Sequence, residues 1–157
     1  MKKIAIALLI MSFAANATAA SVPVTREALL YYVNENAKNL PMRIDAATTI
    51  TGVALLSHNV VLWRYKIDAG ALLKQIAKQG GIPVEELTMR ASERYGNPQN
   101  FITATMKQEM SESVSKKNCN TPAVRNFLER GVLVKHAYYY LDESLFFEST
   151  VDISSCR

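Results

Sequence analysis

Two histidines, His58 and His136, are the residues best suited by type to acid–base catalysis in this chain of 157 residues. Nucleophilic catalysis needs such a base beside an activated serine or cysteine. His58 stands in a polar stretch typical of a turn, His136 in a run typical of a strand, and neither accompanies a Gly-x-Ser-x-Gly elbow or a catalytic cysteine signature. We expect no catalytic residues. An enzyme with scattered residues stays open, with Arg43, Asp45, His136 and the tyrosines as its candidates.

Metal, cofactor and nucleic-acid sites also lack their usual patterns. The sequence contains no His-Glu-x-x-His and no Cys-x-x-Cys pair. Gly80-Gly81 is typical of a helix end rather than of a phosphate loop, and Glu85-Glu86 suits the first turn of a helix. Lysines and arginines are too scattered to indicate a nucleic-acid surface. We therefore predict no metal, no cofactor and no nucleic-acid partner.

The first twenty residues have the order of a cleavable signal peptide. Lys2 and Lys3 are followed by an apolar run from Ile4 to Ala15 and by small residues up to Ala20. The run is shorter than the roughly 20 residues that span a bilayer, and no cysteine follows it to accept a lipid. We predict a signal peptide over 1–20 and a single soluble domain over 21–157, in the periplasm or secreted. Cleavage lowers the net charge from +4 to 16 − 14 = +2.

Cys119 and Cys156 are the only cysteines. Because an exported chain meets an oxidising compartment, we expect them to form a disulfide. The bond would close a loop of 156 − 119 = 37 residues and stabilise the fold by roughly 3–4 kcal/mol. Free thiols in a redox or metal site are the alternative, but no histidine stands near either cysteine.

Hydrophobic spacing predicts helices and hairpins in alternation. A helix from Thr25 to about Asn39 precedes a hairpin with its turn at Ser57-His58-Asn59. Further helices begin at Asp68, Pro83, Asn97-Pro98 and Thr121-Pro122, the third of which loses its apolar pattern in the polar stretch 115–118.

Two final strands, Val132–Leu141 and Leu145–Ile153, form the second hairpin, whose last strand alternates Leu145, Phe147, Val151 and Ile153 inward. The fold class is α+β and two-layer. An antiparallel sheet of about four strands, from the two hairpins, is packed by the N-terminal helix and several central helices.

Three consecutive tyrosines, Tyr138, Tyr139 and Tyr140, lie within the first strand of the second hairpin. Tyr139 must face opposite to its neighbours, so one face of the strand carries exposed tyrosine. Tyrosine is enriched where one side is apolar and the other wet, as in protein interfaces. We therefore treat the three tyrosines as a possible interface.

Both ends of the mature chain resemble a group of small exported proteobacterial proteins. The residues concerned are Leu40-Pro41-Met42-Arg43-Ile44-Asp45 at the start and Cys119, Thr121-Pro122, Arg125, Leu128, Gly131-Val132, Tyr138-Tyr139-Tyr140 and Cys156 at the end. The group is the quorum-sensing-regulated virulence factor type of periplasmic protein. The resemblance covers about half of the mature chain, departs from the group over 82–115, and implies export and a two-layer α/β domain without catalytic residues.

The missing chemistry favours a non-enzymatic periplasmic accessory or binding protein with a protein partner in the envelope. It would serve an envelope, secretion, conjugation or virulence system. A periplasmic immunity or inhibitor protein against a delivered toxin is the alternative, because such proteins are also small, exported and chemically inert. An uncharacterised hydrolase is the second alternative.

Overall fold

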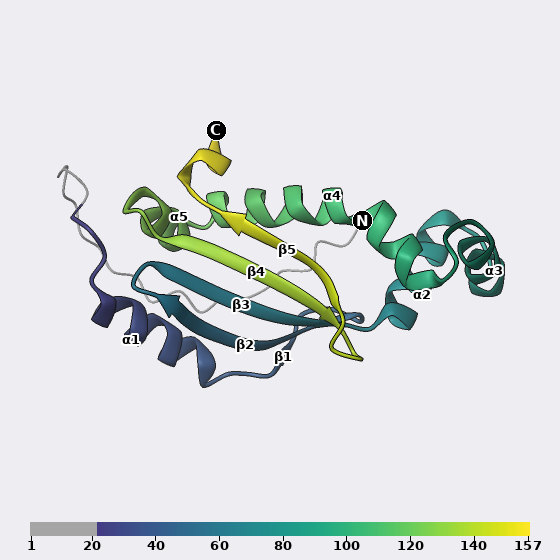
Figure 1. Cartoon of the computed structure of the whole chain (residues 1–157), viewed down its shortest axis with the longest axis horizontal. Helices are drawn as coiled ribbons and strands as arrows, with labels where there is room; N and C mark the ends of the chain where they lie inside the picture. Colours follow the sequence, from purple (N-terminus) through teal and green to yellow (C-terminus); the bar gives the residue numbers. More distant parts are fainter. Residues whose placement is uncertain (1–21) are drawn as a thin grey trace.

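The computed structural model describes residues 22–157, so the predicted signal peptide over 1–20 lies outside the described residues. Within them, helices and one five-stranded sheet form two layers (Figure 1). The helices pack on one face of the sheet, and no helix crosses in front of the strands on the other (Figure 1). None of the described helices has the length and apolar character needed to cross a membrane.

The first helix, α1 (Arg26–Ala37), begins where the sequence predicts. The Thr25 hydroxyl accepts a hydrogen bond from the Ala28 amide at 3.2 Å, which satisfies one of the unpaired N–H groups of the first turn. Leu29 and Val33 are buried and pack against Val61 of the sheet. α1 thus covers the end of the sheet at which the turn joins β2 and β3.

The sheet differs from the expectation in strand number and direction. Its order is β1 (Met42–Arg43), β2 (Thr48–Ser57), β3 (Val60–Ile67), β4 (Leu133–Tyr140) and β5 (Leu145–Val151). Both predicted hairpins are present, but β3 and β4 pair in parallel, so the purely antiparallel sheet of four strands was wrong. β1 has only two exposed residues, too few for a periodic pattern to reveal.

The parallel pair follows from the helical crossover between the hairpins. The chain returns to the start of β3 through α2 (Ala69–Gly80), α3 (Val84–Tyr95), α4 (Pro98–Asn120) and α5 (Pro122–Glu129). Parallel neighbours need such a crossover, whereas a short loop would have made them antiparallel. The Asp68 and Asn97 side chains cap α2 and α4 as expected. α4 continues through the polar stretch 115–118, where the side chain of the buried Asn118 donates to the Val114 carbonyl.

A register shift in the second hairpin changes the predicted inward pattern. Tyr138 pairs with Phe147, but Tyr139 pairs with Leu145, which leaves Phe146 as an extra residue on β5. Phe146 therefore points into the core, and Leu145 is 54% exposed on the opposite face. Phe147 and Val151 are buried as predicted. Ile153 is exposed, because it begins the short 3-10 helix η1 (Ile153–Cys156).

Candidate interaction surface

Among residues 22–157, no helix packs on one face of the sheet, which we call the open face. Side chains on it alternate with the buried residues of each strand. The pairings of Leu62 with Lys135, Arg64 with Ala137 and Lys66 with Tyr139 place these residues side by side. The open face comprises Arg43, Thr49, Gly52, Ala54, Val60, Leu62, Arg64, Lys66, Leu133, Lys135, Ala137, Tyr139, Leu145, Glu148 and Thr150.

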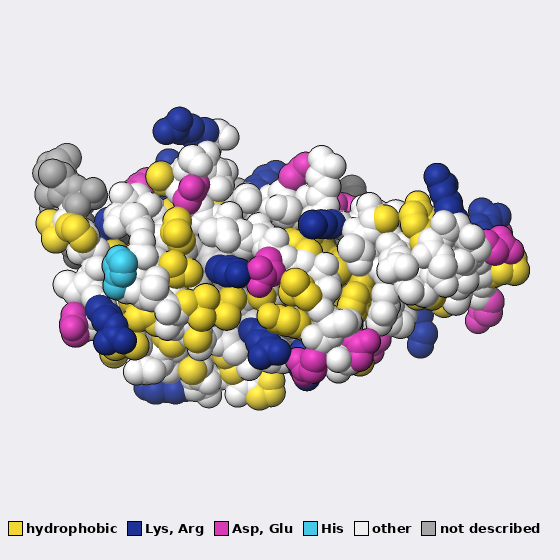
Figure 2. All heavy atoms as spheres, viewed as in Figure 1, with side chains coloured by type: hydrophobic (Ala, Val, Ile, Leu, Met, Phe, Trp, Pro, Cys, Tyr) yellow, Lys and Arg dark blue, Asp and Glu magenta, His cyan; other side chains and the backbone are white. Residues whose placement is uncertain are grey.

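Apolar side chains gather over the strands on this face, with basic and acidic side chains among them (Figure 2). Val60 pairs with Leu133 at one end of the open face, and Tyr139 pairs with Leu145 at the other. All four are partly or fully exposed. A sheet face with this mixture suits a protein partner better than a small ligand, because small-molecule sites are concave.

Glu143, from the turn between β4 and β5, reaches back over the open face. Its carboxylate pairs with Arg64 at 2.8 Å and with Lys66. The Arg64 guanidinium also lies 4.4 Å from the centre of the Tyr139 ring, a cation–π contact. The pKa of the Glu143 carboxyl lies below its usual value, chiefly because of the Lys66 ammonium and to a smaller extent because of Arg64. These four residues form a charged cluster, which we call the Glu143 cluster.

A second ion pair lies further along the open face. Lys135 Nζ and Glu148 Oε2 are 2.9 Å apart on neighbouring strands. Both side chains are partly exposed, and so the pair contributes little to stability. The strands of the open face thus present four cations, Arg43, Arg64, Lys66 and Lys135, against the single acid Glu148. The Arg43 guanidinium donates to the carbonyls of Asp45 and Ala46.

The three predicted tyrosines do not share a surface. Tyr138 and Tyr140 are only 6% and 4% exposed, whereas Tyr139 lies on the open face and is partly exposed. The Tyr138 ring stacks between Tyr65 and Phe147 at centroid distances of 4.2 and 4.7 Å. The Tyr140 hydroxyl donates to the Gln99 carbonyl at 3.0 Å. Of the predicted interface, Tyr139 alone is placed to meet a partner.

His136, a catalytic candidate, is 6% exposed in the core. Asn118 Nδ2 lies 2.7 Å from the Val114 carbonyl and 3.0 Å from His136 Nε2. Because the Asn118 Nδ2 group is a donor, His136 Nε2 accepts the hydrogen bond. The other ring nitrogen of His136 therefore carries the proton, and its Nδ1–H donates to the Tyr65 hydroxyl oxygen at 2.9 Å. Burial, helped by the charge of Lys117, lowers the pKa of His136 to about 4. Both ring nitrogens are engaged, which is the arrangement of a structural histidine.

The other enzyme candidates hold a turn together. The Asp45 carboxylate accepts from the amides of Ala47 and Thr48 at 2.7 and 2.8 Å. The Arg43 Nε donates to the Asp45 carbonyl at 2.9 Å. Arg43 is the last residue of β1 and Asp45 lies in the connection between β1 and β2, and both are exposed. His136 is buried, so the structure does not assemble the scattered site. Residues 22–157 contain no group of three or more His, Cys, Asp or Glu able to hold a metal.

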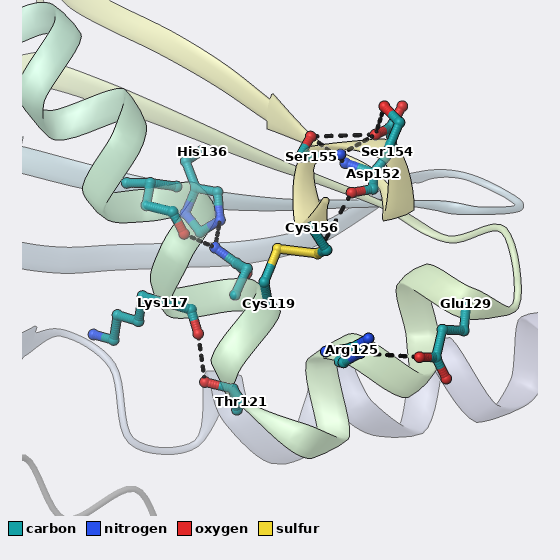
Figure 3. Close-up of a disulfide and its surroundings, with 12 residues drawn as sticks. Lys117, Cys119, Thr121, Arg125, Glu129, His136, Asp152, Ser154, Ser155 and Cys156 are labelled. Atoms are coloured by element: carbon teal, nitrogen blue, oxygen red, sulfur yellow. Dashed lines mark hydrogen bonds and ion pairs between the residues drawn. A yellow bond between two sulfur atoms is a disulfide. The ribbon is translucent and has the colours of Figure 1, made fainter.

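Cys119 and Cys156 form the predicted disulfide, which joins the last turn of α4 to η1 (Figure 3). Asp152 caps η1 by accepting from the Ser155 amide at 3.1 Å. A shallow groove of about 500 Å³ lies beside the bond. Its lining includes Ser111, Ser115, Lys116, Ser155 and Arg157. This groove has neither an aromatic wall nor a buried polar group aimed into it.

Sequence reasoning missed Arg64, Lys66, Glu143 and Leu145 as surface residues. The alternation of Arg64 and Lys66 with Tyr65 was visible, and it indicates a strand with one polar face. What was not visible is that no helix covers this face. Glu143 gives no pattern at all, because it reaches the open face from a turn.

No protein-family model and no curated protein sequence matches the chain. Solved structures do share its fold. A candidate secreted protein from Pseudomonas aeruginosa superposes with a TM-score of 0.59 at 12% identity, covering 84% of this chain and 92% of its own. The pilotin EpsS of the Vibrio vulnificus type 2 secretion system superposes with a TM-score of 0.54 at 16% identity, covering 85% of this chain and 94% of its own. The type II secretion pilotin AspS from Vibrio cholerae superposes with a TM-score of 0.50 at 14% identity, covering 82% of this chain and 90% of its own.

Proposed function

We propose that this chain is a non-enzymatic accessory protein of a secretion-related system of the cell envelope, and that it binds a protein partner through the open face. The observation that carries the proposal is the uncovered sheet face with its exposed apolar and basic side chains. Such contiguous apolar surface on a small protein often marks a protein interaction site.

The fold shared with two type II secretion pilotins supports the secretion-related role. At 12–16% identity, the comparison shows the fold alone, and the secretion-related role is our inference from that shared fold. The disulfide and the likeness to a candidate secreted protein agree with export to the periplasm.

Within residues 22–157, the candidate catalytic residues do not come together, which supports a binding role. His136 is buried with both ring nitrogens hydrogen-bonded, and Arg43 and Asp45 stabilise a turn. Recognition of a second protein does not require such residues to come together.

The test compares the same charge insertion at three positions, two on the open face and one control on α3. Leu62→Glu and Leu133→Glu place a carboxylate on the open face, and Met89→Glu places one on α3, where the side chain is 56% exposed. Tagged proteins are purified from envelope extracts of the native host, and co-purifying proteins are quantified by mass spectrometry. A partner that both open-face variants lose and Met89→Glu retains supports the proposal. Equal recovery with all three variants would place the interaction elsewhere.

The genes beside this one separate the accessory role from the alternative. Neighbouring secretion or pilus genes support the accessory role. A toxin gene immediately beside it would instead support an immunity protein.

A further inference from the structure

We infer that Arg64 and Lys66 form a binding pair for a carboxylate of the partner, and that Glu143 occupies this position in the free protein. The partner segment is therefore one that carries an aspartate or glutamate next to an apolar side chain. The inference rests on the proposed function, because it takes the open face as the docking surface.

Charge on the open face points to an acidic partner. The strands supply four cations, Arg43, Arg64, Lys66 and Lys135, and the one acid Glu148. Glu148 pairs with Lys135, and Arg43 donates to the carbonyls of Asp45 and Ala46. Arg64 and Lys66 would have no acidic counterpart on the sheet without Glu143. A single carboxylate from a turn thus neutralises two cations, and an incoming acid is the group that complements the remaining charge.

The donors of the pair are suited to a further carboxylate. The Arg64 guanidinium contacts Glu143 through Nη2. A guanidinium has five N–H donors in a planar fork, which matches the two oxygens of a carboxylate. The Lys66 ammonium has three N–H donors, and its salt bridge to Glu143 Oε1 does not use all of them. Both cations therefore keep donors that an acidic side chain from outside could engage.

An apolar contact lies directly beside this charged pair. The Tyr139 ring lies under Arg64, and Leu145, which pairs with Tyr139 across the strands, is 54% exposed. Leu141, in the same turn as Glu143, is also exposed. A carboxylate bound at Arg64 and Lys66 thus brings its neighbouring residues over leucine and tyrosine.

Glu143 is held in a way that permits its displacement. Its side chain is about half exposed, and exposed ion pairs are weak because water competes for both charges. Its backbone has φ of 66°, in the left-handed region that residues other than glycine adopt at a cost. A partner carboxylate competes with a weak contact rather than with a buried one.

The experiment uses photo-crosslinking in the native host. A benzoylphenylalanine is placed at Leu145, beside the Glu143 cluster, at Leu62, further along the open face, and at the exposed Met89 on α3 as a control position. Each is combined with the double variant Arg64→Gln/Lys66→Gln, with Glu143→Gln, and with the matched pair Lys135→Gln and Glu148→Gln. Adducts are quantified, and the crosslinked peptide is sequenced. Thermal melts confirm that each variant is folded.

We expect an adduct at Leu145 whose peptide contains aspartate or glutamate. Its yield should fall about fivefold or more in Arg64→Gln/Lys66→Gln and rise about twofold in Glu143→Gln, as expected for exposed charge pairs. Lys135→Gln and Glu148→Gln should change the yield little.

Two other outcomes distinguish failure of the carboxylate-binding pair from failure of the docking surface. Adducts at Leu62 or Leu145 with yields insensitive to the charges of the Glu143 cluster would overturn the carboxylate pair and leave the proposed docking surface standing. Absence of adducts at both positions, for variants that fold normally, would overturn the docking surface and the carboxylate pair together.

Discussion

Asn118 Nδ2 lies 3.0 Å from His136 Nε2, and this contact ties the residue before a disulfide-bonded cysteine to the centre of the sheet. His136 in turn donates to Tyr65 on the neighbouring strand. The last turn of α4 is therefore held to β4 and β3 by hydrogen bonds inside the core, and to η1 by a covalent bond at its edge.

Removal of the Asn118 amide should destabilise the fold. Asn118→Leu leaves the His136 Nε2 acceptor buried without a donor, which costs about 1–3 kcal/mol. Urea denaturation of the purified protein measures the loss. Asn120→Leu, two residues later in the same helix and exposed, is the matched control and should change stability by less than about 0.5 kcal/mol. Equal effects of the two would mean that the buried network contributes nothing.

Stability should fall as the pH is lowered from about 6.5 to about 4. His136 has its pKa lowered from 6.5 to about 4 by burial, so the unfolded chain binds more protons than the folded one in this window. The stability due to the neutral side chain is complete above pH 6.5 and is lost as the pH approaches 4, a change on the order of 2–3 kcal/mol.

Denaturation midpoints measured between pH 4 and pH 7.5 give this slope. His136→Gln should flatten it, and His58→Gln, in the exposed turn between β2 and β3, should leave it unchanged. A slope that survives His136→Gln would assign the pH dependence to other groups.

The three tyrosines of β4 should respond differently to alanine. Tyr138→Ala and Tyr140→Ala each open a cavity in the core and should cost about 3–5 kcal/mol. Tyr139→Ala loses a partly exposed ring and its contact with Arg64, and should cost under about 1 kcal/mol. Chemical denaturation measures all three. Equal destabilisation would show that the open face is covered, contrary to the docking proposal.

Loss of the disulfide should destabilise the protein by roughly 3–4 kcal/mol, because the bond closes a loop with a sequence separation of 37 residues in the unfolded chain. Cys119→Ala/Cys156→Ala is compared with wild type by denaturation, with and without a reductant. The reductant should lower the stability of wild type to that of the double variant and leave the double variant unaffected. Wild type that is indifferent to full reduction would contradict the entropic role.

The processed protein should begin at Ala20 or Ser21, after the small residues that end the predicted signal peptide. Intact mass of protein isolated from the periplasm decides this directly. Recovery of the full 157 residues from a membrane fraction would contradict both the processing and the prediction of a soluble domain.

Local signals predicted most helix starts and the position of both hairpins. Thr25, Asp68 and Asn97 each cap a helix in the structure, because capping depends on the nearest few residues. The strand alternation of Tyr138, Tyr139 and Tyr140 was also correct, although it left open which set faces the core.

Features that depend on distant contacts were not predicted. The parallel pairing of β3 and β4 depends on how the whole crossover packs, and the extra residue Phe146 depends on the partner strand. The open face likewise follows from where the helices lie, and not from any strand by itself. Glu143 contacts Arg64 and Lys66 only because the sheet brings them together, since Glu143 and Arg64 are 79 residues apart in the sequence.

The parallel pair at the centre of the sheet has a consequence for the order of folding. Val60 pairs with Leu133, which is synthesised 133 − 60 = 73 residues later. The hairpin of β2 and β3 closes a short loop, whereas the β3–β4 pairing must wait for four helices and closes a long one, which is slow. Pulse-labelled hydrogen exchange should therefore protect the β2–β3 amides before those between β3 and β4. Until β4 arrives, one edge of β3 has no strand beside it, so a nascent chain of this fold passes through a stage at which its central strand can pair with the wrong partner.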